Sequence, residues 1–109
     1  MSDLILFPGV DSWPENVYTD KLRTWLLEES DDEITWPTER ICNIAASLAE
    51  TLPTIYRMVT DADGGIVFTT PYNYWWRYHI WDNGEVDRID MQDGKVVKRD
   101  RIRTVDNLT

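Results

Sequence analysis

An aromatic stretch, Tyr72–Trp81, constrains the fold of this 109-residue chain more than any other feature. It contains three of the six tryptophans, three of the five tyrosines and the only histidine. Aromatic residues favour strands, and turn-forming residues flank this stretch on both sides. We therefore expect it to form the central strand of an antiparallel sheet.

Side chains alternate across a strand, so this stretch divides into two faces. The more apolar face comprises Tyr74, Trp76, Tyr78 and Ile80, and the other comprises Trp75, Arg77, His79 and Trp81. We expect the first face to pack beneath helices. The second places a cation between tryptophans, an arrangement enriched at binding hot spots, and is our predicted binding site. The alternative is a ladder of cross-strand pairs that only stabilises the sheet.

Period-two patterns and turn residues predict an antiparallel meander of about five strands around this stretch. Besides the aromatic strand, the expected strands are residues 55–60, 66–70, 85–91 and 95–101. The connecting turns are Asp61–Gly65, Asp82–Gly84 and Gln92–Gly94. We attribute both Gly64 and Gly65 to positive φ angles in the first turn.

Helical periodicity precedes the strands. We expect one helix at about residues 14–29, with Ser12 as its N-cap and Glu15 as the capping-box acid. A second helix opens at about residue 35, carries an apolar stripe and stops at Leu52-Pro53. The stripe comprises Ile41, Ile44, Ala45, Leu48, Ala49 and Leu52.

These elements predict a single α+β domain over residues 1–109, with two N-terminal helices packed on one face of a four- to five-stranded antiparallel meander. The apolar segment Asp3–Val10 precedes the first helix. It fits either an edge strand or an arm that packs on the same chain or on another copy.

Charge is high and uneven along the chain. The formal net charge is −9 and the sequence pI is about 4.4, so nucleic acid and anionic membranes should repel the protein. All the excess acid lies in residues 1–63, whereas the last predicted strand is basic. The basic strand fits an edge that discourages sheet extension, or head-to-tail self-association with the acidic half. Its bases are Lys95, Lys98, Arg99, Arg101 and Arg103.

Cys42 is the only cysteine and cannot form an internal disulfide, which suits a reducing compartment. The first residues lack the basic flank and apolar core of a signal peptide, and no apolar run is long enough to span a bilayer. We therefore expect a cytoplasmic protein.

Two patterns invite a chemical interpretation. Asp61-x-Asp63-Gly64 resembles the beginning of a calcium loop, but no later acid completes it, so we interpret it as a turn. Catalysis by His79 would need an acid from a neighbouring strand, such as Asp87 or Asp90. We predict no catalytic residue, no metal site and no cofactor, and hence no enzyme.

The segment from Thr35 to Arg101 resembles small uncharacterised bacterial α+β proteins. They share a helix, a Leu-Pro break, a strand, an Asp-Gly-Gly-Ile turn with an aromatic residue two positions on, and a meander. Here the pattern is carried by Leu52-Pro53, Asp63–Ile66, Phe68 and Asp82–Gly84. The resemblance implies an α+β meander and no particular activity.

Acidity, small size and the missing catalytic set together predict a non-catalytic protein-binding module, such as an inhibitor, an immunity-type protein or an accessory protein. It would bind a protein partner, or another copy, through the acidic helical surface or the face carrying Trp75, Arg77 and Trp81. One alternative is a small-ligand or carbohydrate-binding domain that uses the aromatic face. The other is an acidic mimic of nucleic acid. We expect neither direct nucleic-acid binding nor membrane binding.

Overall fold

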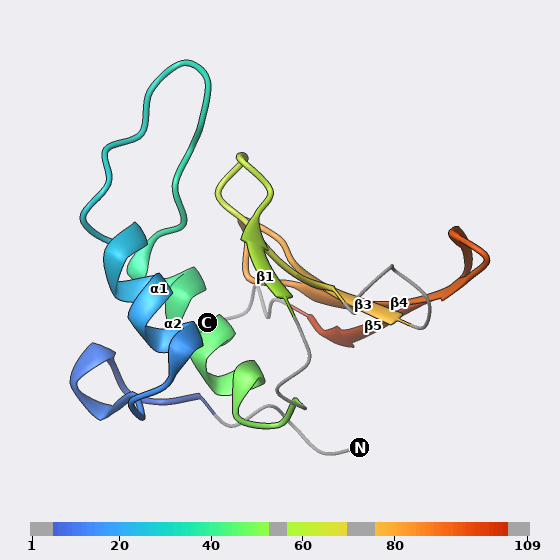
Figure 1. Ribbon diagram of the computed structural model, residues 1–109, viewed down its shortest axis with the longest axis horizontal. Helices are drawn as coiled ribbons and strands as arrows, with labels where there is room; N and C mark the ends of the chain where they lie inside the picture. The colour runs from blue at the N-terminus through green and yellow to red at the C-terminus, as the bar shows by residue number, and fades with distance from the viewer. Residues whose placement is uncertain (1–5, 53–56, 70–75, 105–109) are drawn as a thin grey trace.

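The computed structural model describes residues 6–52, 57–69 and 76–104, and it has the predicted α+β architecture (Figure 1). Two helices precede five strands, which form one antiparallel sheet in the order β1-β2-β3-β4-β5. The elements are η1 (Val10–Ser12), α1 (Val17–Trp25), α2 (Glu39–Ala49), β1 (Arg57–Thr60), β2 (Ile66–Thr69), β3 (Trp76–Ile80), β4 (Val86–Gln92) and β5 (Lys95–Arg103).

Helix α1 begins later than predicted. Its N-cap is Asn16, whose side-chain oxygen accepts from Thr19 N at 2.9 Å, while Thr19 Oγ1 accepts from Asn16 N at 3.0 Å. This reciprocal pair satisfies two backbone donors at the helix start. Ser12, the predicted cap, lies in η1 and donates its hydroxyl to Gly9 O. The predicted N-cap was therefore wrong by four residues.

The end of α1 was also predicted too late, since the helix stops at Trp25 and not near residue 29. The acids that follow would oppose the helix dipole if the helix continued through them. Helix α2 is also shorter than predicted: it begins at Glu39 and not near residue 35, and it ends at Ala49 and not at Leu52. Thr38 caps it, with Ile41 N donating to Thr38 Oγ1 at 3.4 Å. Cys42 is fully buried in α2, and burial, with the charge of Glu39, raises the pKa of its thiol to about 12.

The core lies between the helices and one face of the sheet. Ile80 of β3 is fully buried there, and Trp76 and Tyr78 pack against the same cluster, as the alternation of that strand predicts. Tyr74 lies outside the described residues. The cluster also includes Leu22, Trp25, Ile41, Ile44, Leu48, Met58, Ile66, Phe68 and Val86. In Figure 1 the helices accordingly lie to one side of the strands.

The described part of the N-terminal segment is an arm on the same chain, not an edge strand. Phe7 N donates to Ser47 Oγ at 2.9 Å, and Asn43 Nδ2 donates to Phe7 O. Trp13 is only 4% exposed and donates its indole N–H to Asn43 Oδ1 at 2.9 Å. Residues 6–13 are thus tied to α2 in cis.

Strand β5 is an edge of the sheet, as expected of the basic strand. Lys95, Lys98 and Arg99 are exposed along it, together with Val96 and Val97. Lysines on an edge discourage pairing with another chain. Within the described residues, no helix is long and apolar enough to cross a membrane.

The assignment of the cap can be tested directly. Asn16→Ala should lower the free energy of unfolding by about 1 kcal/mol, because it removes the acceptor that satisfies Thr19 N. Ser12→Ala, the matched control, should change it by less than about 0.5 kcal/mol, since Ser12 is exposed and caps no α-helix. Urea unfolding of both variants measures the difference. A larger cost for Ser12→Ala would contradict the assignment.

Candidate functional site

Arg77 and His79, two of the predicted binding residues, lie on the sheet face turned away from the helices, which we term the outer face. Trp75 lies outside the described residues. Arg77 sits opposite Thr69 of β2 and Ile89 of β4. His79 and Trp81 are stacked, with ring centroids 3.7 Å apart and planes inclined by 15°. The structure thus brings two of the four predicted residues into direct contact.

His79 has a carboxylate partner that the sequence analysis did not assign to it. Its Nε2 lies 2.8 Å from Asp61 Oδ2, and both side chains are largely buried. Asp61 Oδ1 also accepts from Asp63 N and Gly65 N, each at 2.8 Å. Burial alone would raise the pKa of Asp61, but the hydrogen bonds from His79 and the two amides, with the charge of His79, together lower it. Asp61 therefore faces His79 as a carboxylate.

Gly65 makes this contact sterically possible. A Cβ on Gly65 would overlap the Asp61 carboxylate and lie 2.5 Å from Ile80 O. The Asp61 side chain can therefore reach across β2 to His79 only because residue 65 has no side chain. The prediction that both glycines serve positive φ angles was half right, since Gly64 has φ 89° whereas Gly65 supplies space.

A second carboxylate, Asp87 of β4, holds the other end of the stack. Asp87 is 1% exposed, and its Oδ2 accepts the indole N–H of Trp81 at 2.9 Å. Arg101 of β5 pairs with the same carboxylate and also with Glu85. Burial would raise the pKa of Asp87, but the hydrogen bonds from Arg101 and Trp81 and the charges of Arg101 and Arg99 lower it.

The outer face thus carries one connected chain of hydrogen bonds, ion pairs and a ring stack, which runs from Asp61 through His79, Trp81, Asp87 and Arg101 to Glu85. Asp87 and Asp90, named above as examples of acids that could serve His79, have other partners. Asp87 binds Trp81 and Arg101, and Asp90 pairs with Arg88.

The pair of His79 and Asp61 has the geometry of an acid–base group. The only cysteine, Cys42, is fully buried in α2, and the pKa of its thiol is raised to about 12. A nucleophilic cysteine needs the thiolate form, which this raised pKa disfavours. Within the described part of the chain, no three His, Cys, Asp or Glu residues are grouped so that they could hold a metal ion.

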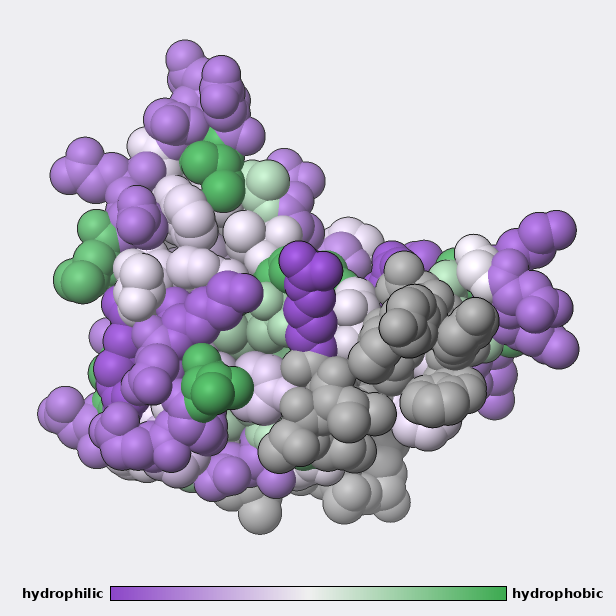
Figure 2. Space-filling model, viewed as in Figure 1, coloured by the Kyte–Doolittle hydropathy of each residue, from purple (hydrophilic) through white to green (hydrophobic). Residues whose placement is uncertain are grey.

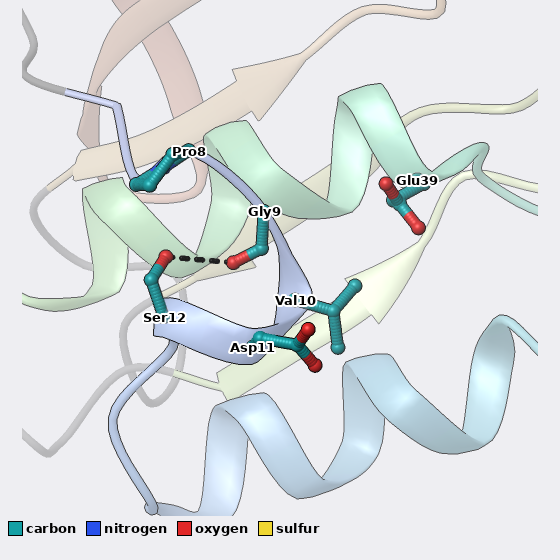
Figure 3. A pocket seen from close by; sticks show the side chains of 6 residues that line it. All are labelled: Pro8, Gly9, Val10, Asp11, Ser12 and Glu39. Carbon is teal, nitrogen blue, oxygen red and sulfur yellow. Dashed lines mark hydrogen bonds between the residues drawn. The ribbon is translucent and has the colours of Figure 1, made fainter.

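A hollow lies elsewhere, between η1 and the start of α2 (Figure 3). Its lining residues are Pro8, Gly9, Val10, Asp11, Ser12 and Glu39. Its titratable lining residues, Asp11 and Glu39, are both acids, and none of the outer-face residues contributes to it. The hollow therefore belongs to the acidic half of the molecule.

The strongest concentration of charge is the loop between the helices, residues 26–38, which we term the acidic loop. Its acids are Glu28, Glu29, Asp31, Asp32 and Glu33. Figure 1 shows this loop projecting away from the body, and Figure 2 shows hydrophilic residues covering its tip. Leu27, at the base of the loop, is 85% exposed.

The acidic loop has an internal structure of its own. Asp31 Oδ1 accepts from Glu33 N and Ile34 N, which lower the pKa of this carboxyl, and Asp31 N donates to Ile34 O. Further along, Thr35 N donates to Ala62 O at 2.8 Å, and Gly64 N donates to Thr35 O at 2.9 Å. The loop is therefore fastened to the turn between β1 and β2.

None of the five loop carboxylates has a cationic partner in the part of the chain that the structure describes, where no Lys or Arg nitrogen lies within 4.0 Å of them. The outer face differs in this respect, because its two buried carboxylates are both engaged. The acidic loop is accordingly a surface on which five acids close together in the sequence have charge left for a partner.

Comparison with known proteins gives no direct lead to the function: no family model, no curated protein and no solved structure matches the chain. The resemblance to small bacterial α+β proteins therefore stays a prediction, and any function has to be argued from the geometry.

The role of Asp87 can be tested by Asp87→Asn, which preserves shape but removes the charge. We expect a loss of about 2–4 kcal/mol in the free energy of unfolding at pH 7, because Arg101 loses its buried partner. Asp90→Asn, the matched control on the same strand, removes a more exposed ion pair and should cost less than about 1 kcal/mol. Urea unfolding of the two variants provides the comparison.

The stability of the wild-type protein and that of Asp87→Asn should depend differently on pH. The folded-state pKa of Asp87 is lowered, so its stabilisation is complete above the unfolded value of about 3.9 and is lost as the pH falls through the folded value. The gap between the wild-type protein and Asp87→Asn should therefore shrink as the pH falls below about 4. A gap that is constant or grows on acidification would contradict this role.

Proposed function

We propose that the chain is a non-catalytic acidic protein-binding module, of the inhibitor, immunity or accessory kind, which binds a basic protein surface through the acidic loop. The observation that carries the proposal is the set of five loop carboxylates without a cationic partner among the described residues. Exposed charges of one sign steer a partner of the opposite sign and select against others.

The shape of the loop supports the same function. A segment whose backbone is already fixed loses less conformational entropy on binding. The Asp31 turn and the Thr35 contacts fix the acidic loop in this way. Leu27 adds an exposed apolar side chain next to the charges, as an interface core surrounded by a polar rim requires.

The outer face is less suited to this role. A carbohydrate or flat ligand would need an open aromatic ring, but His79 stacks on Trp81 and the indole N–H is bonded to Asp87. A ligand there would have to displace both contacts. These internal contacts favour the acidic loop over the aromatic face as the binding surface.

A four-residue charge variant tests the proposal. Glu28→Gln, Glu29→Gln, Asp32→Asn and Glu33→Gln remove four charges and leave Asp31 to hold the turn. The control variant, Glu39→Gln, Glu50→Gln, Asp82→Asn and Asp93→Asn, removes the same charge from exposed sites elsewhere. Partners are first identified by co-purification from the native host, and the affinity of each variant for the purified partner is then measured.

The loop variant should bind the partner at least about tenfold more weakly, with a smaller dependence on salt, while the control variant binds like the wild-type protein. Competition with DNA for the same partner would instead support an acidic mimic of nucleic acid. Equal loss in both variants would show that only net charge matters, and would contradict a specific role of the loop. Failure to recover any reproducible partner would also count against the proposal.

A further inference from the structure

Two arginines from distant parts of the sequence meet at the turn between β3 and β4. Arg40 lies in the first turn of α2 and donates from Nη1 to Asn83 O at 3.1 Å. Arg103, at the end of β5, donates from Nη1 to Gly84 O at 2.5 Å. A Cβ placed on Gly84 would lie 2.9 Å from Arg40 Nη2 and 3.2 Å from Arg103 Nη1. Both guanidinium groups thus border a single point above the turn.

Gly84 keeps that point open. Its φ is 92°, which favours glycine, and a Cβ there would require the Arg40 guanidinium to shift. The two guanidinium groups consequently border the same small space above Gly84, with no side chain between them.

This pair of like charges has no compensating acid within the described residues: no carboxylate oxygen lies within 4.0 Å of either guanidinium. Burial, together with the charge of Arg40, lowers the pKa of Arg103. Two adjacent cations are unexpected in a chain of net charge −9, which has acids in excess for pairing. Each guanidinium has five N–H donors, and one of them is bonded to a turn carbonyl.

We propose that Arg40 and Arg103 form a binding site for a phosphate group. Two guanidinium groups carry a charge of +2, which a phosphate dianion balances and a single carboxylate does not. Their remaining N–H groups lie in a plane and in pairs, so they can donate parallel hydrogen bonds to phosphate oxygens. The site is independent of the acidic loop, so it is separate from the proposed protein-binding function.

The test is a titration of the ¹⁵N-labelled protein with inorganic phosphate, followed by NMR, against sodium chloride at matched ionic strength. The wild-type protein should show saturable shifts of the amides of Asn83 and Gly84 and of the arginine Nε–H groups. Arg40→Gln and Arg103→Gln should each weaken binding about tenfold or more. Arg57→Gln removes the same charge from an exposed residue of β1 and should leave binding unchanged.

A parallel titration with phenyl phosphate identifies the source of the phosphate group. Tighter binding of the ester assigns the site to a phosphate monoester, and tighter binding of the free anion assigns it to inorganic phosphate; either result supports the site. Arg40 is exposed, so Arg40→Gln keeps the test valid even if Arg103→Gln fails to fold. Equal shifts with chloride, or unchanged phosphate binding in Arg40→Gln, would overturn the proposal.

Discussion

The buried carboxylate of Asp87 is the interaction on which the outer face of the sheet depends. The helices cover the opposite face, where Ile80 and Val86 enter the core. A charge that is 1% exposed is costly unless it is paired and hydrogen-bonded, and Asp87 meets both conditions through Arg101 and Trp81. One side chain thereby links β4 to β5 and to the residue that follows β3. The carboxylate of Asp61 extends the same chain of contacts through His79 to the end of β1.

This arrangement changes how the aromatic stretch should be interpreted. A tryptophan, a histidine and an arginine on one strand face suggest a binding surface when they are considered alone. In the folded chain, His79 and Trp81 stack on each other and bind carboxylates of their own sheet. Function is then better sought where charge has no internal partner: at the acidic loop and, with opposite sign, at the turn where Arg40 and Arg103 meet.

The sequence predicted the helix layer and the sheet layer well, but it did not predict the hydrogen-bond partners on the outer face. Alternation grouped Trp76, Tyr78 and Ile80 on one face, and the more apolar composition of that face favoured the core side, where the structure has it. The contacts of the outer face depend on neighbours across strands. Trp81 bonds Asp87, a diagonal neighbour in the next strand, and His79 bonds Asp61 across the width of β2.

Local signals were ambiguous in a similar way at the start of α1. Ser12 with Glu15 matches the spacing of a capping box, but the reciprocal pair in the structure forms four residues later, between Asn16 and Thr19. The structure assigns the cap to Asn16, while Trp13 is buried and bonded to Asn43. The Gly64-Gly65 pair did carry a usable signal, since a second glycine beside the turn glycine often marks a close approach.

Hydrogen exchange of the indole N–H of Trp81 tests whether the Asp87 carboxylate holds the outer face together. If Asp87 holds this group, the Trp81 indole signal should exchange as slowly as that of Trp13, which is bonded to Asn43. Exchange of the Trp81 indole at the rate of a free indole, in a protein whose core amides stay protected, would contradict the account and would reopen the outer face as a binding surface.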